Sequence, residues 1–159
     1  MTATSSTGAT AEVEARSGWI ERAAAGLAPY APTILRLFAG FVFLQYGLNK
    51  LPNPDGFATF VGSLGFPAPT LFAWLVIGLE TIGAIALIVG LLVRPIALLF
   101  LIEMTVTSLL VKLQRGIAPA EGGAGLELDI LLWAIAAVLV ILGAGRLSID
   151  RDVLRRDLI

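Results

Sequence analysis

Ionisable side chains lie inside the long apolar segments of this chain. Glu80 and Glu103 fall near the middle of two such segments, and Lys50 closes another in the stretch FLQYGLNKLP, residues 43–52. A carboxyl group in apolar surroundings is tolerated when a cation pairs with it or when it carries a proton. These residues therefore predict a polar site inside the fold, suited to an ion pair, a proton or the head group of a ligand.

Helical spacing groups further polar residues with these three. Gln45 and Asn49 are one turn apart on a helix, and so are Tyr46 and Lys50. Lys50 could pair with Glu103 or with Glu127, and of the two acidic residues that begin the last apolar segment we expect Glu127 to face inward and Asp129 to lie nearer the interface. The candidate lining residues of the pocket are Arg36, Gln45, Tyr46, Asn49, Lys50, Glu80, Glu103 and Glu127.

Simpler interpretations compete with a pocket at several of these positions. Lys50 could extend to the lipid head groups, and Asn49 with Pro52 could simply end a helix. Glu127 and Asp129 could be an acidic first turn, which the helix dipole favours. Glu80 and Glu103 resist such explanations because they are mid-segment, although interhelical hydrogen bonding alone accounts for many residues of this kind.

The composition indicates a membrane protein. Of 159 residues, 57% are hydrophobic and 14% are charged, whereas about 25% are charged in an ordinary soluble domain. The net charge of −1 gives no field that attracts nucleic acid. The chain has no cysteine and no histidine, which excludes disulfides and iron–sulfur clusters and makes a haem or zinc site an unfavourable hypothesis, so that no metal is expected. An organic cofactor or a quinone remains open.

Four apolar segments have about the 20-residue length that crosses a bilayer as a helix. They are residues 33–51, 70–93, 95–113 and 126–143, separated by Pro52 and Pro54, by Pro67 and Pro69, by Arg94-Pro95, and by a Gly- and Pro-containing stretch around residues 116–123. Connections this short favour antiparallel neighbours. We therefore expect an all-α fold, an antiparallel four-helix transmembrane bundle spanning residues 33–150. Residues 1–17 read as a disordered polar tail, 18–32 as an interfacial helix or a linker, and 151–159 as a charged tail.

The distribution of basic residues predicts the orientation. With four crossings, one side carries Arg16, Arg22, Arg36, Arg94, Arg146, Arg151, Arg155 and Arg156, and the other carries Lys50, Lys112 and Arg115. This bias places both termini in the cytoplasm. We expect a multi-pass protein of a prokaryotic plasma membrane. Arg36 then lies near the cytoplasmic edge, and the other polar candidates extend from mid-membrane to the outer face.

Several motifs resemble the DoxX family of small four-helix membrane proteins. The matching stretches are LRLFAGFVFLQYGLNKL (35–51), LGFPAP (64–69), LETIGAIALIVGLLVRP (79–95) and GAGRLSID (143–150). The resemblance covers roughly residues 33–150 and implies the membrane location and the fold more firmly than any activity. Members often carry histidine where this chain has Tyr46, which weakens a role for an imidazole in proton transfer or metal binding.

The resemblance implies a link to redox chemistry. DoxX-like proteins include a membrane subunit of an archaeal thiosulfate:quinone oxidoreductase, and others are associated with redox-stress complexes or with the maturation of periplasmic enzymes. We therefore expect a membrane subunit or accessory of a redox system that binds a quinone or small amphiphile, works with a redox partner protein and is not a catalyst alone. The alternative is non-enzymatic: a small-solute or proton pathway, or an assembly factor for another membrane protein. Homo-oligomerisation stays open.

Overall fold

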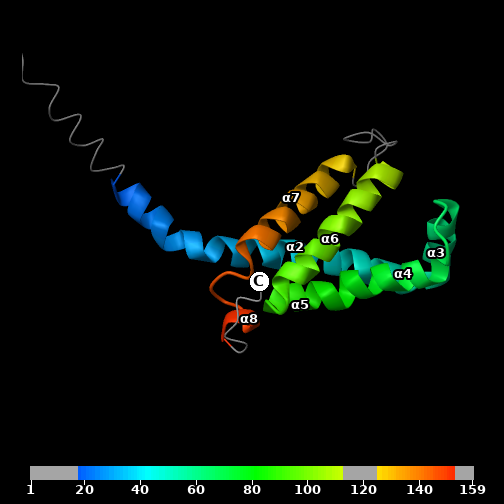
Figure 1. Cartoon of the computed structure of the whole chain (residues 1–159), viewed down its shortest axis with the longest axis horizontal. Helices are drawn as coiled ribbons and strands as arrows, with labels where there is room; N and C mark the ends of the chain where they lie inside the picture. The colour runs from blue at the N-terminus through cyan, green and yellow to red at the C-terminus, as the bar shows by residue number, and fades with distance from the viewer. Residues whose placement is uncertain (1–17, 113–124, 153–159) are drawn as a thin grey trace, which may run out of the picture.

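The structure is a computed structural model that describes residues 18–112 and 125–152 (Figure 1). Every regular element in those two ranges is helical, as the sequence predicts. The predicted tail 1–17 lies outside the described residues, and so does the predicted tail 151–159 except for its first two residues. The loop expected around residues 116–123 lies outside them as well.

The first long helix runs without a break from Gly18 to Lys50. A 3-10 turn, η1 (Ala28–Tyr30), separates its first turns from α2 (Ala31–Lys50), because Pro29 and Pro32 lack the N–H groups that regular α-helical bonding would use. Residues 18–32 are therefore helical. In Figure 1 the N-terminal part of this helix, drawn in blue, projects away from the other helices.

The second long helix contains a π-helical turn at its centre. It consists of α4 (Pro69–Gly78), the π-helical turn η2 (Leu79–Gly83) and α5 (Ala84–Val89). The Thr81 hydroxyl donates to the carbonyl of Ile77, 2.6 Å away, which competes with the regular helical bonding at this point. A π-helical turn inserts one extra residue into the helix and changes the direction in which the following side chains point.

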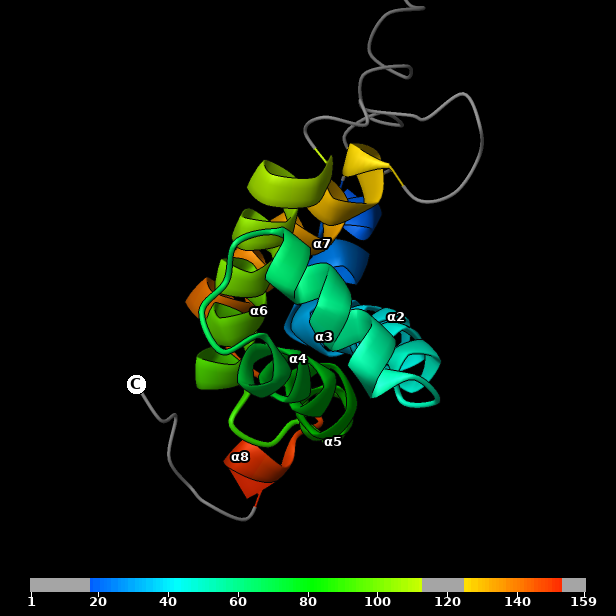
Figure 2. The same cartoon turned by 90° about the vertical axis from the view of Figure 1, so that its right-hand side faces the viewer.

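The third and fourth apolar segments form an antiparallel pair. The third comprises α6 (Val93–Thr107) followed by the π-helical turn η3 (Ser108–Lys112), and the fourth is α7 (Leu126–Leu142). The Trp133 indole N–H donates to the Thr105 hydroxyl across this pair at 3.0 Å. Both views show α6 and α7 side by side, crossing the pair formed by α2 and the α4–α5 helix (Figure 2).

The turn between the second and third helices lies a few residues earlier than the sequence predicts. Helix α5 ends at Val89, and Gly90 takes a left-handed conformation with φ +79°. Helix α6 begins at Val93, so Arg94 and Pro95 belong to its first turn instead of forming a corner. Proline is tolerated in a first helical turn, where no intrahelical N–H bond is lost.

A further helix, α3 (Pro54–Ser63), fills the segment that the sequence analysis treats as a break. Asn53 caps its N-terminus by accepting a hydrogen bond from the Gly56 amide at 3.0 Å, and Pro54 takes a first-turn position. Helix α3 lies across the end of the bundle in Figure 2. It packs on α4 through Ala58, Val61 and Ala73, which form a second, small apolar core.

The outer surface of the described helices is apolar. Phe38 is 69% exposed and Ile82 is 73% exposed, and many other large apolar side chains face outward. A water-soluble protein of this size does not display so much contiguous apolar surface. Three helices are long and apolar enough to cross a membrane: Gly18–Lys50, Pro69–Val89 and Val93–Val111. The prediction is confirmed for these three; α7, with 17 residues, stays a predicted fourth crossing.

Candidate functional site

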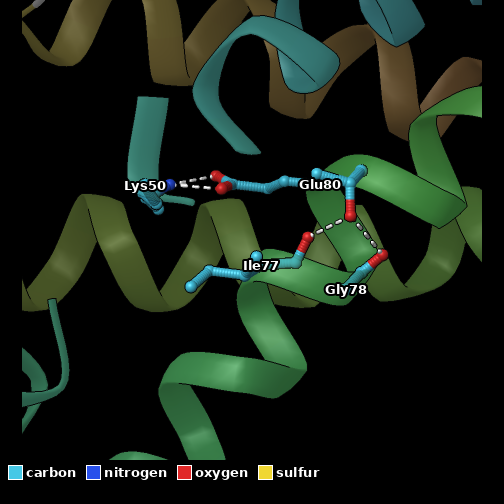
Figure 3. Close-up of polar contacts among 5 residues, drawn as sticks. Lys50, Ile77, Gly78 and Glu80 are labelled. Atoms are coloured by element: carbon cyan, nitrogen blue, oxygen red, sulfur yellow. Dashed lines mark hydrogen bonds and ion pairs between the residues drawn. The ribbon is translucent and has the colours of Figure 1, made fainter. Parts of the chain in front are cut away.

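The centre of the candidate site is an ion pair between α2 and the π-helical turn η2. The Lys50 ammonium donates to both carboxylate oxygens of Glu80, and Figure 3 shows the two side chains meeting end to end. Glu80 is 3% exposed, whereas the Lys50 side chain is 21% exposed. Lys50 therefore pairs with Glu80, and the prediction that it pairs with Glu103 or Glu127 is wrong. The ion pair turns the Lys50 side chain inward, away from the lipid head groups.

A glycine allows the two helices to approach closely enough for this pair. A Cβ added at Gly47 would lie 2.7 Å from Thr81 Cγ2 and 2.8 Å from the carbonyl carbon of Glu80. Any larger residue at position 47 would separate the backbones. Glu80 sits near the middle of the helix Pro69–Val89, so Lys50, at the end of α2, meets it at mid-span.

Three further polar side chains surround the ion pair. The Glu103 carboxyl, from α6, lies within hydrogen-bonding reach of the Glu80 carboxyl. Tyr46, one turn before Lys50, is close enough to Glu80 and Asp129 to interact electrostatically with both. Asp129, from α7, is 5% exposed and interacts electrostatically with Glu103 too. These five residues, Tyr46, Lys50, Glu80, Glu103 and Asp129, are called the polar cluster below.

The polar cluster holds three carboxyl groups against one ammonium group. Two carboxyl groups can form a hydrogen bond only when one of them carries a proton. The second carboxylate oxygen of Glu103, Oε2, is buried and has no hydrogen-bond partner among the described residues. Glu103 Oε2 is thus a buried acceptor atom of the cluster, and a hydrogen bond between the Glu80 and Glu103 carboxyl groups would require a proton on one of them.

Aromatic side chains bound the polar cluster on two sides. The Phe57 ring of α3 lies 5.0 Å from the Lys50 ammonium and the Tyr46 ring lies 5.6 Å from it, both in cation–π range. One helical turn toward the α5–α6 turn, Phe43 and Phe100 stack with ring centroids 3.7 Å apart. Phe57 thus lies beside the Lys50 ammonium, and the Phe43–Phe100 stack lies about one helical turn before the cluster residues of α2 and α6.

Three of the predicted pocket residues do not face the polar cluster. Gln45 and Asn49 are exposed on the outer side of α2, because the face that carries Gly40 and Gly47 packs against the second long helix. Glu127 is exposed too, and its carboxylate accepts a hydrogen bond from the Gly125 amide at 3.2 Å. The expected facing of the first turn of α7 is therefore reversed, with Asp129 buried and Glu127 outside.

Arg36, also predicted to line the pocket, serves as a structural clamp at the other end of α2. It is 2% exposed. Its guanidinium donates to the carbonyls of Leu87 at 3.0 Å and Ile88 at 2.5 Å at the end of α5, and to those of Ala144 at 3.1 Å and Leu147 after α7. Helix C-termini leave their last carbonyls without intrahelical partners, and a buried arginine can satisfy several of them.

The segment GAGRLSID, residues 143–150, completes this clamp. The Asp150 carboxylate accepts hydrogen bonds from the amides of Leu92 at 2.8 Å and Val93 at 3.0 Å, and so caps the N-terminus of α6. Asp150 belongs to the short helix α8 (Ile149–Asp152), and its amide donates to the Gly90 carbonyl at 3.0 Å. This role of Asp150 is not predicted from the sequence, because Asp150 caps a helix that is distant in the chain and local capping signals concern only the residue just before a helix.

Comparison with known proteins identifies the family. The family model described as DoxX matches residues 31–113, which is more than half of the chain. The chain belongs to the DoxX family. The DoxX match includes Tyr46, Lys50, Glu80 and Glu103, whereas Asp129 lies beyond it.

Curated DoxX-type relatives cover most of the chain. It is 31% identical over 122 residues to "Putative oxidoreductase CatD" of Bacillus subtilis (strain 168), covering 77% of this chain and 86% of the relative. It is 34% identical over 140 residues to "Uncharacterized membrane protein Rv3486" of Mycobacterium tuberculosis, covering 80% and 84%. It is 27% identical over 126 residues to "Inner membrane protein YphA" of Escherichia coli (strain K12), covering 77% and 90%. No solved structure matches the chain.

Proposed function

We propose that this DoxX protein is a membrane component of a redox system that binds the head group of a quinone, or of a similar small amphiphile, at the polar cluster. The observation that carries the proposal is the buried Lys50–Glu80 ion pair, with Glu103 against it, near the middle of a membrane-spanning helix. Ionisable groups at such depth are costly and are usually retained for function.

The side chains of the polar cluster match the chemistry of a quinone head group. A quinone presents two carbonyl oxygens, and its reduction to a quinol consumes two electrons and two protons. The Lys50 ammonium and the Tyr46 hydroxyl can donate hydrogen bonds to such oxygens. The Glu80–Glu103 contact can hold a proton at the same place. Because the chain has neither cysteine nor histidine, we assign the electrons to a partner protein or a diffusible cofactor.

The proposal includes an orientation in the plasma membrane of a prokaryote. Helix α7 supplies the fourth crossing and both termini face the cytoplasm, as the excess of arginine on that side favours. The polar cluster then lies at mid-membrane and α3 covers it toward the outer face. An amphiphile would reach the cluster from the bilayer, with Phe57 as the side chain that it must pass or displace.

A continuous path for protons or solutes has less support. Between the polar cluster and the α5–α6 turn the interior is apolar and contains the stacked rings of Phe43 and Phe100. Among the described residues, Arg36 is the only buried charged side chain in that direction, and its guanidinium donates to four carbonyls. The arrangement favours a site that opens on one side of the membrane.

Binding of a short-chain quinone tests the proposal. The protein is reconstituted in lipid nanodiscs and titrated with a soluble quinone analogue, with tryptophan fluorescence or calorimetry as the readout. We expect saturable binding that weakens about tenfold in Glu103→Gln, the equivalent of about 1.4 kcal/mol. The matched control is Glu127→Gln, which removes an exposed carboxylate from the neighbouring helix and should bind as the unmodified protein does.

Two results would overturn the proposal. One is the absence of saturable quinone binding in the folded protein, and the other is equal binding by Glu103→Gln and Glu127→Gln. A thermal unfolding curve of each variant in the same nanodiscs shows whether a loss of binding is only a loss of fold. If a different amphiphile copurifies with the protein and is identified by mass spectrometry, the same pair of variants tests that molecule.

A further inference from the structure

Helix α2 displays two carboxamide side chains on the surface that faces lipid. Gln45 and Asn49 are exposed, and neither side chain has a hydrogen bond to another described residue. Gln45 lies two residues before Gly47, which contacts Glu80 and Thr81 near the centre of the second long helix. Gln45 therefore sits at membrane depth, where acyl chains offer no hydrogen-bond partner.

Gln45 belongs to a regular stripe of exposed large residues. The stripe follows a spacing of four, three, four and three residues, and its members are Ile34, Phe38, Phe41, Gln45 and Leu48. At about 100° per residue these side chains fall within about 40° of a single line along the helix. This is the heptad spacing of the seam between two supercoiled helices. The stripe lies away from Gly40 and Gly47, which contact the second long helix.

We propose that the stripe of α2 is the interface between two copies of this chain, with Gln45 of each copy hydrogen-bonded to Gln45 of the other. Two copies inserted in the same orientation place identical residues at identical depth. A two-fold axis along the membrane normal then brings the two α2 helices together in parallel, and each position on the stripe meets its own counterpart.

A second copy fits the chemistry of this surface better than lipid does. A carboxamide both donates and accepts hydrogen bonds, so it is complementary to another carboxamide. Polar side chains of this type bring membrane helices together, and a single amide within an apolar heptad seam fixes its register. Asn49 flanks the seam one turn beyond Gln45 and can form a second contact of the same kind near its end.

The pairing can be tested by single cysteines, because the natural chain has none. We expect Phe41→Cys and Leu48→Cys each to form a disulfide-linked dimer in native membranes under mild oxidation. Ile82→Cys is the matched control, since Ile82 is at least as exposed and lies at similar depth on the second long helix. It should give only the background of random collisions.

The role of Gln45 is tested by two substitutions that differ in one chemical group. Gln45→Leu keeps the bulk of the side chain without the amide and should weaken dimer formation about tenfold, measured by dilution into detergent micelles or lipid. Gln45→Asn keeps a carboxamide and should retain most of the association. Because Gln45 faces away from the polar cluster, quinone binding by the monomer should be the same in both variants.

The proposal fails if the cysteine at position 82 crosslinks as well as those at 41 and 48. It also fails if the protein is monomeric in lipid at all accessible concentrations, or if Gln45→Leu associates as strongly as the unmodified chain. None of these outcomes bears on the polar cluster, so failure of the interface and failure of the proposed function are separable. Capture of a different membrane protein through Gln45 in place of a second copy would overturn the proposed occupant.

Discussion

Four acidic side chains of similar chemistry occupy four different environments in this protein. Glu80 is paired with Lys50, Glu103 lies against Glu80, Asp129 is buried and Glu127 is exposed. The sequence predicts the interior role of Glu80 and Glu103 because both are mid-segment. It does not predict which residue of the first turn of α7 faces inward, since α7 is apolar on nearly every side and shows no clear amphipathic face.

The partner of Lys50 depends on a detail that the sequence does not display. Glu80 reaches Lys50 because the π-helical turn and Gly47 bring the two backbones into contact. A regular helix read from the sequence gives no reason to prefer Glu80 over Glu103. The polar groups on α2 divide in the same way, with Tyr46 and Lys50 facing the cluster and Gln45 and Asn49 facing out.

Arg36 is expected to stabilise the fold and to leave ligand binding unaffected. Replacing it by methionine leaves buried carbonyls of α5 and of the segment after α7 without donors, at a cost of about 1–3 kcal/mol for each carbonyl that water cannot reach. Arg36→Met should therefore unfold at a markedly lower temperature in detergent. Arg22→Met, which changes an exposed arginine on the same long helix, is the control. Equal melting temperatures for the two variants would contradict the clamp.

At the scale of the elements, close helix packing at Gly47 positions the ion pair. Gly47→Ala would place a Cβ less than 3 Å from the backbone of Glu80 and should cost about 1–3 kcal/mol through overpacking. Gly78→Ala adds the same methyl group to a helix at a position with nothing within 4 Å. That control should be neutral or stabilising by up to about 1 kcal/mol. Unfolding free energies in the same detergent compare the two, and a reversed order would refute the proposed contact.

The cap formed by Asp150 makes its own prediction. Asp150→Ala removes the acceptor for the amides of Leu92 and Val93 and should destabilise the α5–α6 turn by about 1–2 kcal/mol. Asp150→Asn keeps one acceptor oxygen and should lose less. Hydrogen exchange at the start of α6 is the direct measurement. Unchanged protection of these amides in Asp150→Ala would show that the cap contributes nothing.

Most elements can be predicted from the sequence, with boundaries that shift for local reasons. The apolar segments 33–51, 70–93, 95–113 and 126–143 correspond to the helices found at 31–50, 69–89, 93–112 and 126–142. The α5–α6 turn moved because Gly90, not Arg94, changes the direction of the chain. Helix α3 was missed because its prolines were read only as helix breakers, although Asn53-Pro54 is also a signal for a helix start.

At the scale of the whole molecule, the chain is a membrane protein with an apolar exterior and a few charged side chains in its interior. The proposed orientation rests on the distribution of basic residues alone, so it calls for a direct test. Single cysteines introduced as Ser6→Cys and Ser63→Cys should differ, in intact cells, in their reactivity with a thiol reagent that does not cross the membrane. We expect the cysteine at 63, on α3, to react from outside and the one at 6 to react only after permeabilisation. The opposite pattern would invert the proposed orientation.

The most direct test of the account is a double-mutant cycle on Lys50 and Glu80 in lipid nanodiscs. We predict that Lys50→Met and Glu80→Met each lower the unfolding free energy by about 3 kcal/mol or more, because each leaves one buried charge without a partner. The double variant should be more stable than the sum of the two losses implies, by at least about 1.5 kcal/mol. Losses that add to within about 0.5 kcal/mol would mean that the two side chains do not meet, which would contradict the polar cluster at its centre.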